Sequence, residues 1–256
     1  MNKMTIPREP VYPQLPTIEE LAGIFTMDTT AETVVTTFCG KEVDLLSPAQ
    51  SSICILDIAH HESLINRYNG AVEHSVAYHS YLASLLVPGD MALAVLLHDA
   101  AEAYVGDDVK QKKNIVRGSR ELEDRLQRAI YEKFGLVWPQ PSIVKQADLA
   151  IYALELVKLL GWTHKVKALP AAVQNMEIVP KRPKEVRHLF LSRFYDLYYG
   201  ERTIRFENDA LFFSGKAGDA FMVLTQSFDI KDCCETMESG VVNPQSSTRL
   251  FLRKAA

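Results

Sequence analysis

Residues 97–107 read Leu-His-Asp-Ala-Ala-Glu-Ala-Tyr-Val-Gly-Asp, and this stretch decides the interpretation of the whole chain. His98 and Asp99 are neighbours and can reach one cation together, the nitrogen as a borderline ligand and the carboxylate as a hard one. Glu102 is expected one helical turn beyond His98, on the same helix face. A glycine then ends the helix and lets Asp107 fold back toward the same space. The stretch therefore predicts a metal site flanked by two further carboxylates.

Apolar residues at helical spacing extend on both sides of this stretch. The segment 91–103 is apolar nearly all round, as expected for a helix at the centre of a bundle. The expected helices cover residues 71–87, 91–103, 119–134, 142–160 and 183–199. The pattern predicts a mainly α fold, a helical bundle.

The two ends of the chain differ from this helical region. Residues 1–31 carry four prolines near their start and a capping box at 17–20, which predicts an extended arm and a short helix. A short β element is expected within 32–58. Residues 201–256 alternate apolar and polar side chains and then become rich in Ser, Gly and Pro, which predicts a mixed α/β or β appendage of open role. The helical domain is expected to span 32–200.

The composition of the chain narrows the classes of partner and the cellular location that we expect for it. The 256 residues carry a formal net charge of −4, with 47% hydrophobic and 23% charged residues, as in an ordinary globular protein. The acidic balance argues against a nucleic-acid partner. No apolar run reaches the roughly 20 residues that span a bilayer, and the N-terminus does not read as a signal peptide. The four cysteines form no paired framework, so we expect a cytoplasmic protein with no membrane partner.

Two further residues complete a ligand set around His98 and Asp99. His74 falls in the expected helix 71–87 and Asp148 in the expected helix 142–160, and three antiparallel helices can bring such positions around one cavity. Two imidazoles and two carboxylates suit Mn²⁺, Fe²⁺, Co²⁺ or Zn²⁺ and disfavour a pure Mg²⁺ site. His79 is five residues from His74, so we expect it to face elsewhere as a structural residue.

Several motifs carry a family resemblance. They are residues 38–48 (Phe-Cys-Gly-Lys-Glu-Val-Asp-Leu-Leu-Ser-Pro), Arg67-Tyr68-Asn69-Gly70, Val72-Glu73-His74-Ser75 and Leu96 to Asp107. Over about residues 36–160 the chain resembles the HD-domain metal-dependent phosphohydrolases, and it is similar to bacterial 5′-deoxynucleotidases and phage dATP triphosphohydrolases. The resemblance implies an HD bundle, one divalent metal ion (Mn, Co, Fe or Zn, with Mg as a further option) and a homo-oligomer.

The resemblance also implies a role for each site residue. The implied metal ligands are His74, His98, Asp99 and Asp148. Glu102 and Asp107 would handle the proton and position the attacking water, and Arg67 would hold phosphate near the metal. Lys113 stands where relatives carry a lysine, and Lys110 adds positive charge beside it. Apart from the resemblance, Glu155 lies seven residues after Asp148 on the same face of the expected helix, and this spacing predicts that it orients a ligand or binds the ribose.

The expected activity is hydrolysis of a small-molecule nucleotide, with a deoxynucleotide as the first choice of substrate. The sequence leaves two forms open, a 5′-deoxynucleotidase and a dNTP triphosphohydrolase, and the lysines at 110–113 favour the longer polyanion slightly. The alternative from another class is a non-catalytic HD scaffold that binds a nucleotide or a protein partner.

Overall fold

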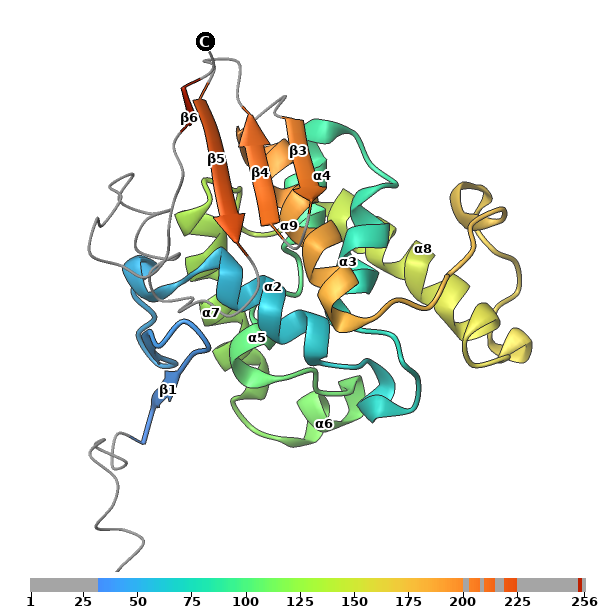
Figure 1. Cartoon of the computed structure of the whole chain (residues 1–256). Helices are drawn as coiled ribbons and strands as arrows, with labels where there is room; N and C mark the ends of the chain where they lie inside the picture. Colours follow the sequence, from blue (N-terminus) through green and yellow to red (C-terminus); the bar gives the residue numbers. More distant parts are fainter. Residues whose placement is uncertain (1–31, 200–202, 208–209, 215–218, 225–252, 255–256) are drawn as a thin grey trace, which may run out of the picture. The chain divides into compact units, whose positions relative to one another are not determined.

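A computed structural model of the chain describes residues 32–199, 203–207, 210–214, 219–224 and 253–254 (Figure 1). The predicted N-terminal arm and short helix, and the Ser/Gly/Pro-rich part of the predicted appendage, lie outside the described residues.

The described chain is mainly helical, which confirms the predicted fold class. Its α-helices are α2 (Ile55–Leu64), α3 (Val76–Ser84), α4 (Gly89–Leu96), α5 (Glu102–Val105), α6 (Lys110–Ile115), α7 (Ser119–Lys133), α8 (Ser142–Lys158) and α9 (Pro183–Tyr199). Short 3-10 helices lie between them: η1 (Gln50–Ser52), η2 (Tyr68–Gly70), η3 (Thr163–Lys165) and η4 (Ala171–Val173). The predicted helices 119–134, 142–160 and 183–199 match α7, α8 and α9 closely.

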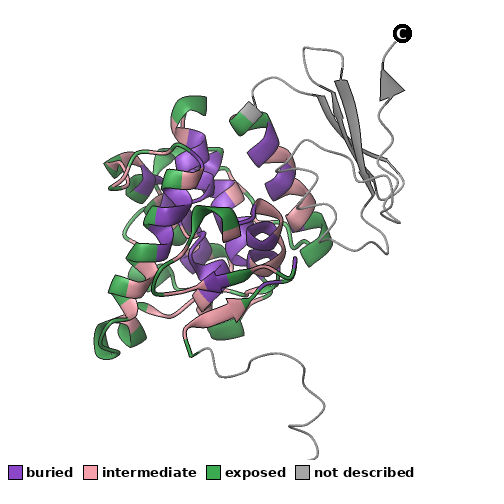
Figure 2. Cartoon of the chain, turned by 90° about the vertical axis from the view of Figure 1, so that its left-hand side faces the viewer, coloured by how far each residue is buried: buried purple, intermediate pink, exposed green. Residues whose placement is uncertain are grey.

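The core lies where these helices face one another. Helix α2 contacts α3, α5 and α9, while α3 also contacts α4, α8 and α9. Every residue of α4 from Ala92 to Leu96 is buried, as the apolar sequence predicts, and α9 adds Phe190 and Phe194. Figure 2 shows the buried residues on the facing sides of the helices and the exposed ones outside. Helices α3 and α8 and the end of α4 are thus held in a packed interior.

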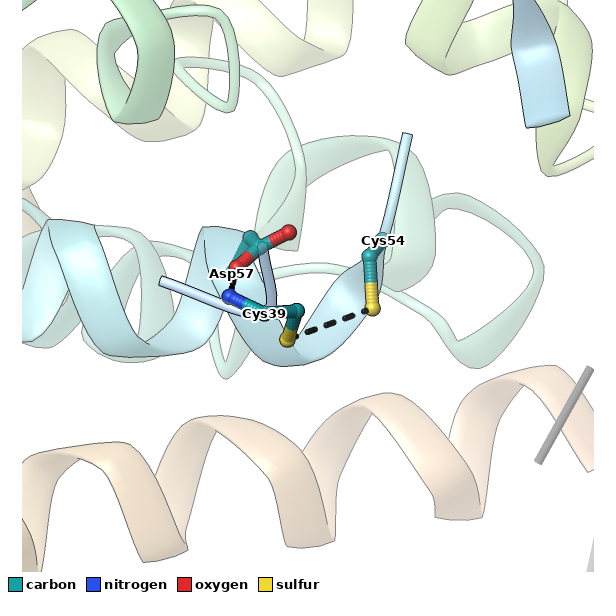
Figure 3. A group of neighbouring side chains, drawn as sticks. All are labelled: Cys39, Cys54 and Asp57. Carbon is teal, nitrogen blue, oxygen red and sulfur yellow. Dashed lines mark hydrogen bonds between the residues drawn. The ribbon is translucent and has the colours of Figure 1, made fainter. Parts of the chain in front are cut away.

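A small antiparallel sheet precedes the helices, which confirms the predicted β element. Strand β1 (Val34–Thr36) pairs with β2 (Glu42–Asp44), with Val35 opposite Val43. The turn after β1 is held at the start of α2, since the Cys39 backbone N–H donates to Asp57 Oδ1 at 2.7 Å (Figure 3).

A second antiparallel sheet falls within the predicted appendage. Its strands β3 (Thr203–Glu207), β4 (Ala210–Ser214), β5 (Asp219–Leu224) and β6 (Arg253–Lys254) neighbour one another in that order. The alternating sequence therefore forms strands here.

The predicted single helix over 91–103 is wrong, because the chain breaks between α4 and α5. A continuous helix would join the Ala101 N–H to the Leu97 carbonyl, and at the break a side chain of α7 binds both groups instead. Gln127 accepts the Ala101 N–H at 3.0 Å and donates to the Leu97 carbonyl at 2.6 Å. Gln140 donates to the His98 carbonyl at 2.9 Å. His98 and Asp99 therefore lie in a turn that a distant side chain clamps.

The predicted helix over 71–87 is also too long at its start. Ser75 caps α3, its side chain accepting the Tyr78 N–H, and the chain before it pairs back on itself. The Arg67 N–H donates to the His74 carbonyl at 2.9 Å, and the Val76 N–H donates to the Ile65 carbonyl at 3.0 Å. His74 consequently lies just outside the helix rather than in its middle.

Among the described residues, no helix has the length and apolar character that crossing a membrane requires.

Candidate metal centre

Two histidines and two aspartates converge in the interior from α3, the α4–α5 turn and α8. His79 Nε2 lies 3.2 Å from Asp148 Oδ1, and His98 Nε2 lies 3.9 Å from the same oxygen. Asp99 Oδ2 is 3.1 Å from His98 Nε2. Ligand atoms of His79, His98 and Asp148 all fall within 4.8 Å of one another, close enough to share one ion. We call His79, His98, Asp99 and Asp148 the His–Asp group.

The two imidazoles present their Nε2 atoms to the carboxylates without a hydrogen bond. His98 Nδ1 donates to the Val95 carbonyl at 2.8 Å, and His79 Nδ1 donates to Glu155 Oε1 at 2.6 Å. In a neutral ring the other nitrogen then carries a lone pair. Both Nε2 atoms are buried and make no hydrogen bond of acceptable geometry. Nitrogen and oxygen lone pairs that face each other in a buried space favour a cation between them.

The charges of the His–Asp group also suit a cation. Burial alone raises the pKa of Asp99, but the neighbouring His98, His79 and Arg67 outweigh it and hold that pKa well below its usual range. Burial likewise opposes ionisation of Asp148, yet His79 and His98 lower its pKa to about 2. Burial lowers the pKa of His98, but the two aspartates outweigh it and raise that pKa above its ordinary value, so they favour a positive charge at Nε2 that a metal ion would supply in place of a proton. Both carboxylates are therefore ionised at neutral pH.

The structure brings together three of the four predicted ligands and replaces the fourth. His98, Asp99 and Asp148 meet as the sequence predicts, but the imidazole beside them belongs to His79, not His74. His74 Nε2 instead contacts Glu155 Oε1 at 2.9 Å. The signal that identifies His79 is Ser75, a preferred helix N-cap residue. With the helix beginning there, His79 lies one turn inside α3 and His74 lies outside it.

The two predicted proton-handling carboxylates lie beside the His–Asp group. Glu102 is buried, and its Oε2 atom has no hydrogen-bond partner among the described residues. Burial, together with the charges of Asp99 and Asp107, raises the pKa of Glu102 well above its usual value. Burial and the charge of Asp99 also raise the pKa of Asp107, although Arg67 opposes them. The pKa of each of these two carboxyl groups is therefore raised above its ordinary value.

Acidic side chains pair with lysines in the segment predicted to bind phosphate. Lys113 Nζ lies 3.2 Å from Glu102 Oε1 and 2.8 Å from Glu123 Oε1, so two carboxylates share its charge. Lys110 is exposed on α6, and its neighbour Lys112 pairs with Asp108. Sequence reasoning missed Glu123, whose only signal is its place on the inner side of the amphipathic helix α7.

Arg67, which the resemblance assigns to phosphate binding, lies beside the His–Asp group. Its Nη1 lies 3.8 Å from Asp99 Oδ2, and its Nε donates to Glu155 Oε2 at 3.1 Å. The residues that follow adopt left-handed backbone conformations, with φ of 58° at Tyr68 and 55° at Asn69. Such conformations cost about 1–2 kcal/mol per non-glycine residue. Strain of this kind gathers at functional sites, where the surroundings hold it in place.

A second group with metal-ligand residues is less suited to a cation. Cys39, Cys54 and Asp57 are buried and have ligand atoms within 4.8 Å of one another. However, Asp57 Oδ1 already accepts the Cys39 N–H, and the carboxylate points to that nitrogen rather than between the sulfur atoms, which are 4.0 Å apart (Figure 3). This group ties the hairpin to α2.

Fold and site together define a mainly helical protein with a buried His–Asp group fit for a divalent metal. The chain belongs to the same family as the uncharacterized protein YfdR of Escherichia coli K12. The two are 33% identical over 169 residues, which cover 64% of this chain and 94% of YfdR. The uncharacterized protein RCAP_rcc00048 of Rhodobacter capsulatus is 36% identical over 180 residues, which cover 62% of this chain and 92% of that protein. No protein-family model matches the chain.

Proposed function

We propose that this protein is an HD-type, metal-dependent phosphohydrolase that acts on nucleotides. The observation that carries the proposal is the pair of buried Nε2 atoms, from His79 and His98, that face ionised Asp99 and Asp148 without hydrogen bonds. Nitrogen and carboxylate donors in this number match Mn²⁺, Fe²⁺, Co²⁺ or Zn²⁺ better than Mg²⁺. Such a metal supplies Lewis acidity toward a phosphoryl oxygen and lowers the pKa of water.

The residues beside the His–Asp group have matching tasks. Arg67, whose guanidinium reaches Asp99, donates hydrogen bonds to the phosphate and offsets its negative charge. Glu102, with its raised pKa and unpartnered Oε2, takes the proton of the attacking water. Asp107 follows Gly106, whose φ of 84° turns the chain back after α5, and it helps to orient that water.

The pairing of the lysines bears on which phosphate is cleaved. A triphosphate needs a basic trough beyond the metal, but Lys113 is held between Glu102 and Glu123 and Lys112 pairs with Asp108. This arrangement favours a substrate with a single phosphoryl group, a deoxynucleoside 5′-monophosphate, over a dNTP.

The proposal extends to the setting of the protein. A cytoplasmic location is proposed from the sequence, since its four cysteines form no paired framework. A homo-oligomer is proposed from the family resemblance alone.

The test is product release from a panel of dNMPs and dNTPs, with Mn²⁺, Co²⁺, Zn²⁺ or Mg²⁺ added to metal-free protein. Inorganic phosphate from dNMPs, absent with a folded Asp99→Ala variant, is the expected result. Triphosphate from dNTPs would correct the substrate while keeping the reaction class. Metal binding without turnover on any nucleotide would overturn the proposal in favour of a binding protein.

A further inference from the structure

The Glu155 carboxylate on α8 is shared by four hydrogen-bond donors. Its Oε1 accepts from His74 Nε2 at 2.9 Å and from His79 Nδ1 at 2.6 Å. Its Oε2 accepts from Arg67 Nε at 3.1 Å and from the Tyr68 hydroxyl at 2.7 Å. The side chain is fully buried. One carboxylate thus joins a residue of the His–Asp group to the residue proposed to bind phosphate.

The bond to His79 determines which nitrogen of that ring faces the metal position. Because Glu155 accepts the Nδ1 proton, the neutral ring keeps its lone pair on Nε2, which points toward Asp148 Oδ1 at 3.2 Å. A carboxylate in this position fixes the orientation of a metal-ligating histidine and makes it a more basic ligand. Without Glu155, the buried ring would have no acceptor at Nδ1 among the contacts described for it.

The bonds to Arg67 and Tyr68 determine how the guanidinium is presented. Arg67 reaches Glu155 with Nε and Asp99 with Nη1, so its plane is held across the edge of the His–Asp group. Tyr68, with φ of 58°, is in a conformation that an aromatic residue rarely adopts. Its hydroxyl bond to Glu155 holds this turn in place, and with it the backbone that carries Arg67.

Glu155 is better described as an anchor than as a metal ligand. Its oxygen lies near those nitrogens of His74 and His79 that could share an ion. However, each of its two oxygens already accepts two hydrogen bonds, so the carboxylate has no lone pair left for a metal ion. The neighbouring charges also hold the pKa of Glu155 well below its usual range, against the effect of burial, so four donors meet an ionised acceptor.

We propose that Glu155 is a positioning residue that sets metal affinity through His79 and phosphate affinity through Arg67. The proposal rests on the proposed function for the identity of these two ligands. It deepens that function by making metal binding and phosphate binding depend on one buried carboxylate.

The main test is Glu155→Gln, which keeps the shape but removes the charge and half of the acceptor capacity. Co²⁺ binding to metal-free protein and inorganic phosphate binding to Co²⁺-loaded protein are measured by calorimetry. We expect Co²⁺ affinity to fall about 10–100-fold and phosphate affinity to fall about tenfold or more. Arg67→Met should lower phosphate affinity alone.

The matched control is Glu62→Gln. Glu62 is a fully buried glutamate on α2, and neither of its oxygens has a hydrogen-bond partner among the described residues. Burial, together with the charge of Asp99, raises the pKa of Glu62 well above its ordinary value, and the amide keeps the shape of the side chain. This variant should bind Co²⁺ as the wild type does.

Three results would overturn the proposal. One is a Glu155→Gln protein that melts at a lower temperature but binds Co²⁺ with wild-type affinity. Another is wild-type protein that binds two Co²⁺ ions where the variant binds one, which would make Glu155 a ligand. The third needs no variant of Glu155: ¹⁵N spectra of metal-free wild type should show His79 protonated at Nδ1, and protonation at Nε2 alone contradicts the proposal.

The outcome is separable from that of the proposed function. If no nucleotide is hydrolysed but Glu155→Gln still weakens Co²⁺ and phosphate binding, the hydrolase is wrong and the positioning role stands. If nucleotides are hydrolysed and Glu155→Gln binds Co²⁺ and phosphate normally, the hydrolase stands and the positioning role of Glu155 is wrong.

Discussion

The Nε2 atom of His79 lies 3.2 Å from Asp148 Oδ1, and the two atoms make no hydrogen bond. They come from α3 and α8, 69 positions apart in the chain (79 to 148). Such an approach of nitrogen to carboxylate in a buried space is the arrangement expected of two ligands to one cation.

His79 and His74 should differ sharply in their effect on metal binding. His79→Ala removes a ligand, so Co²⁺ affinity should fall about 100-fold or more, beyond the loss typical of an outer-sphere partner. His74→Ala removes only a donor to Glu155, so the loss should stay below about tenfold. Circular dichroism first checks that both variants fold. Isothermal titration of the metal-free variants with Co²⁺ then measures the two affinities. A larger loss with His74→Ala would restore the ligand set first predicted from sequence.

Lys113 should set the pH at which the proposed hydrolase becomes active. Its charge, 3.2 Å from Glu102, favours the ionised carboxylate and so lowers the pKa of Glu102 against the effect of burial. Lys113→Met removes that effect, and the Glu102 pKa rises further. Since a general base must be ionised, the acid limb of kcat/KM should move upward by about one pH unit.

The control for that shift is Lys112→Met, which removes a lysine of the same segment that pairs with Asp108 on the surface. Its pH profile should coincide with that of the wild type. An acid limb that moves equally in both variants would show a general charge effect and no special role for Lys113.

Metal should stabilise the fold because the His–Asp group joins three helical segments. A ligand that binds only the folded state adds about 2.7 kcal/mol when its free concentration is 100 times Kd. For a chain of this size that corresponds to roughly 5–10 °C in Tm. Scanning fluorimetry of the protein with Co²⁺, before and after addition of a chelator, measures this shift in Tm. His98→Ala should lose the increment, whereas His164→Ala, at an exposed histidine on η3, should keep it.

His60 should make stability fall in mild acid. Burial, helped by the nearby charge of Arg187, lowers the pKa of His60 from 6.5 to about 4, and Arg187 Nη1 donates to His60 Nδ1 at 2.8 Å. The unfolded chain therefore binds the proton more readily between pH 4 and 6.5. The contribution of neutral His60 to the stability of the fold is therefore complete above pH 6.5 and is lost as the pH falls toward 4.

The size of this effect is modest because His60 is only half-buried. After solvent screening, the pKa shift of His60 contributes about 1 kcal/mol to the free energy of unfolding. Urea unfolding of the wild type and of His60→Asn at several pH values tests it. Parallel curves for the two proteins across this range would contradict the assignment.

Helix positions and the chemical character of the site could be predicted from local sequence. The caps and apolar spacing of 119–134, 142–160 and 183–199 predict α7, α8 and α9, because these signals act within a few residues. His98, Asp99 and Asp148 could be named because charged groups within apolar helical patterns need a partner when buried. Glu102 and Asp107 followed from the same reasoning.

The break between α4 and α5 could not be predicted in this way. Most residues of 91–103 are strong helix formers, and no glycine or proline interrupts them. Gln127, 26 to 30 positions away, supplies the hydrogen bonds that a continuous helix would have made within itself. A side chain from another helix thus overrides local propensity, and its target cannot be read from the segment it stabilises.

By itself, the sequence determined a mainly helical fold and a set of buried imidazoles and carboxylates suited to a divalent metal, since residue type and periodicity are local properties. Ser75 marks the start of α3 in the sequence, but the choice of the histidine that joins Asp148 came from tertiary contacts, because it depends on where α8 carries Glu155. Glu155 takes the His74 nitrogen as a hydrogen-bond donor and turns His79 Nε2 toward the two aspartates. Such a choice is made by contacts between residues 76 to 81 positions apart, where packing sets the geometry.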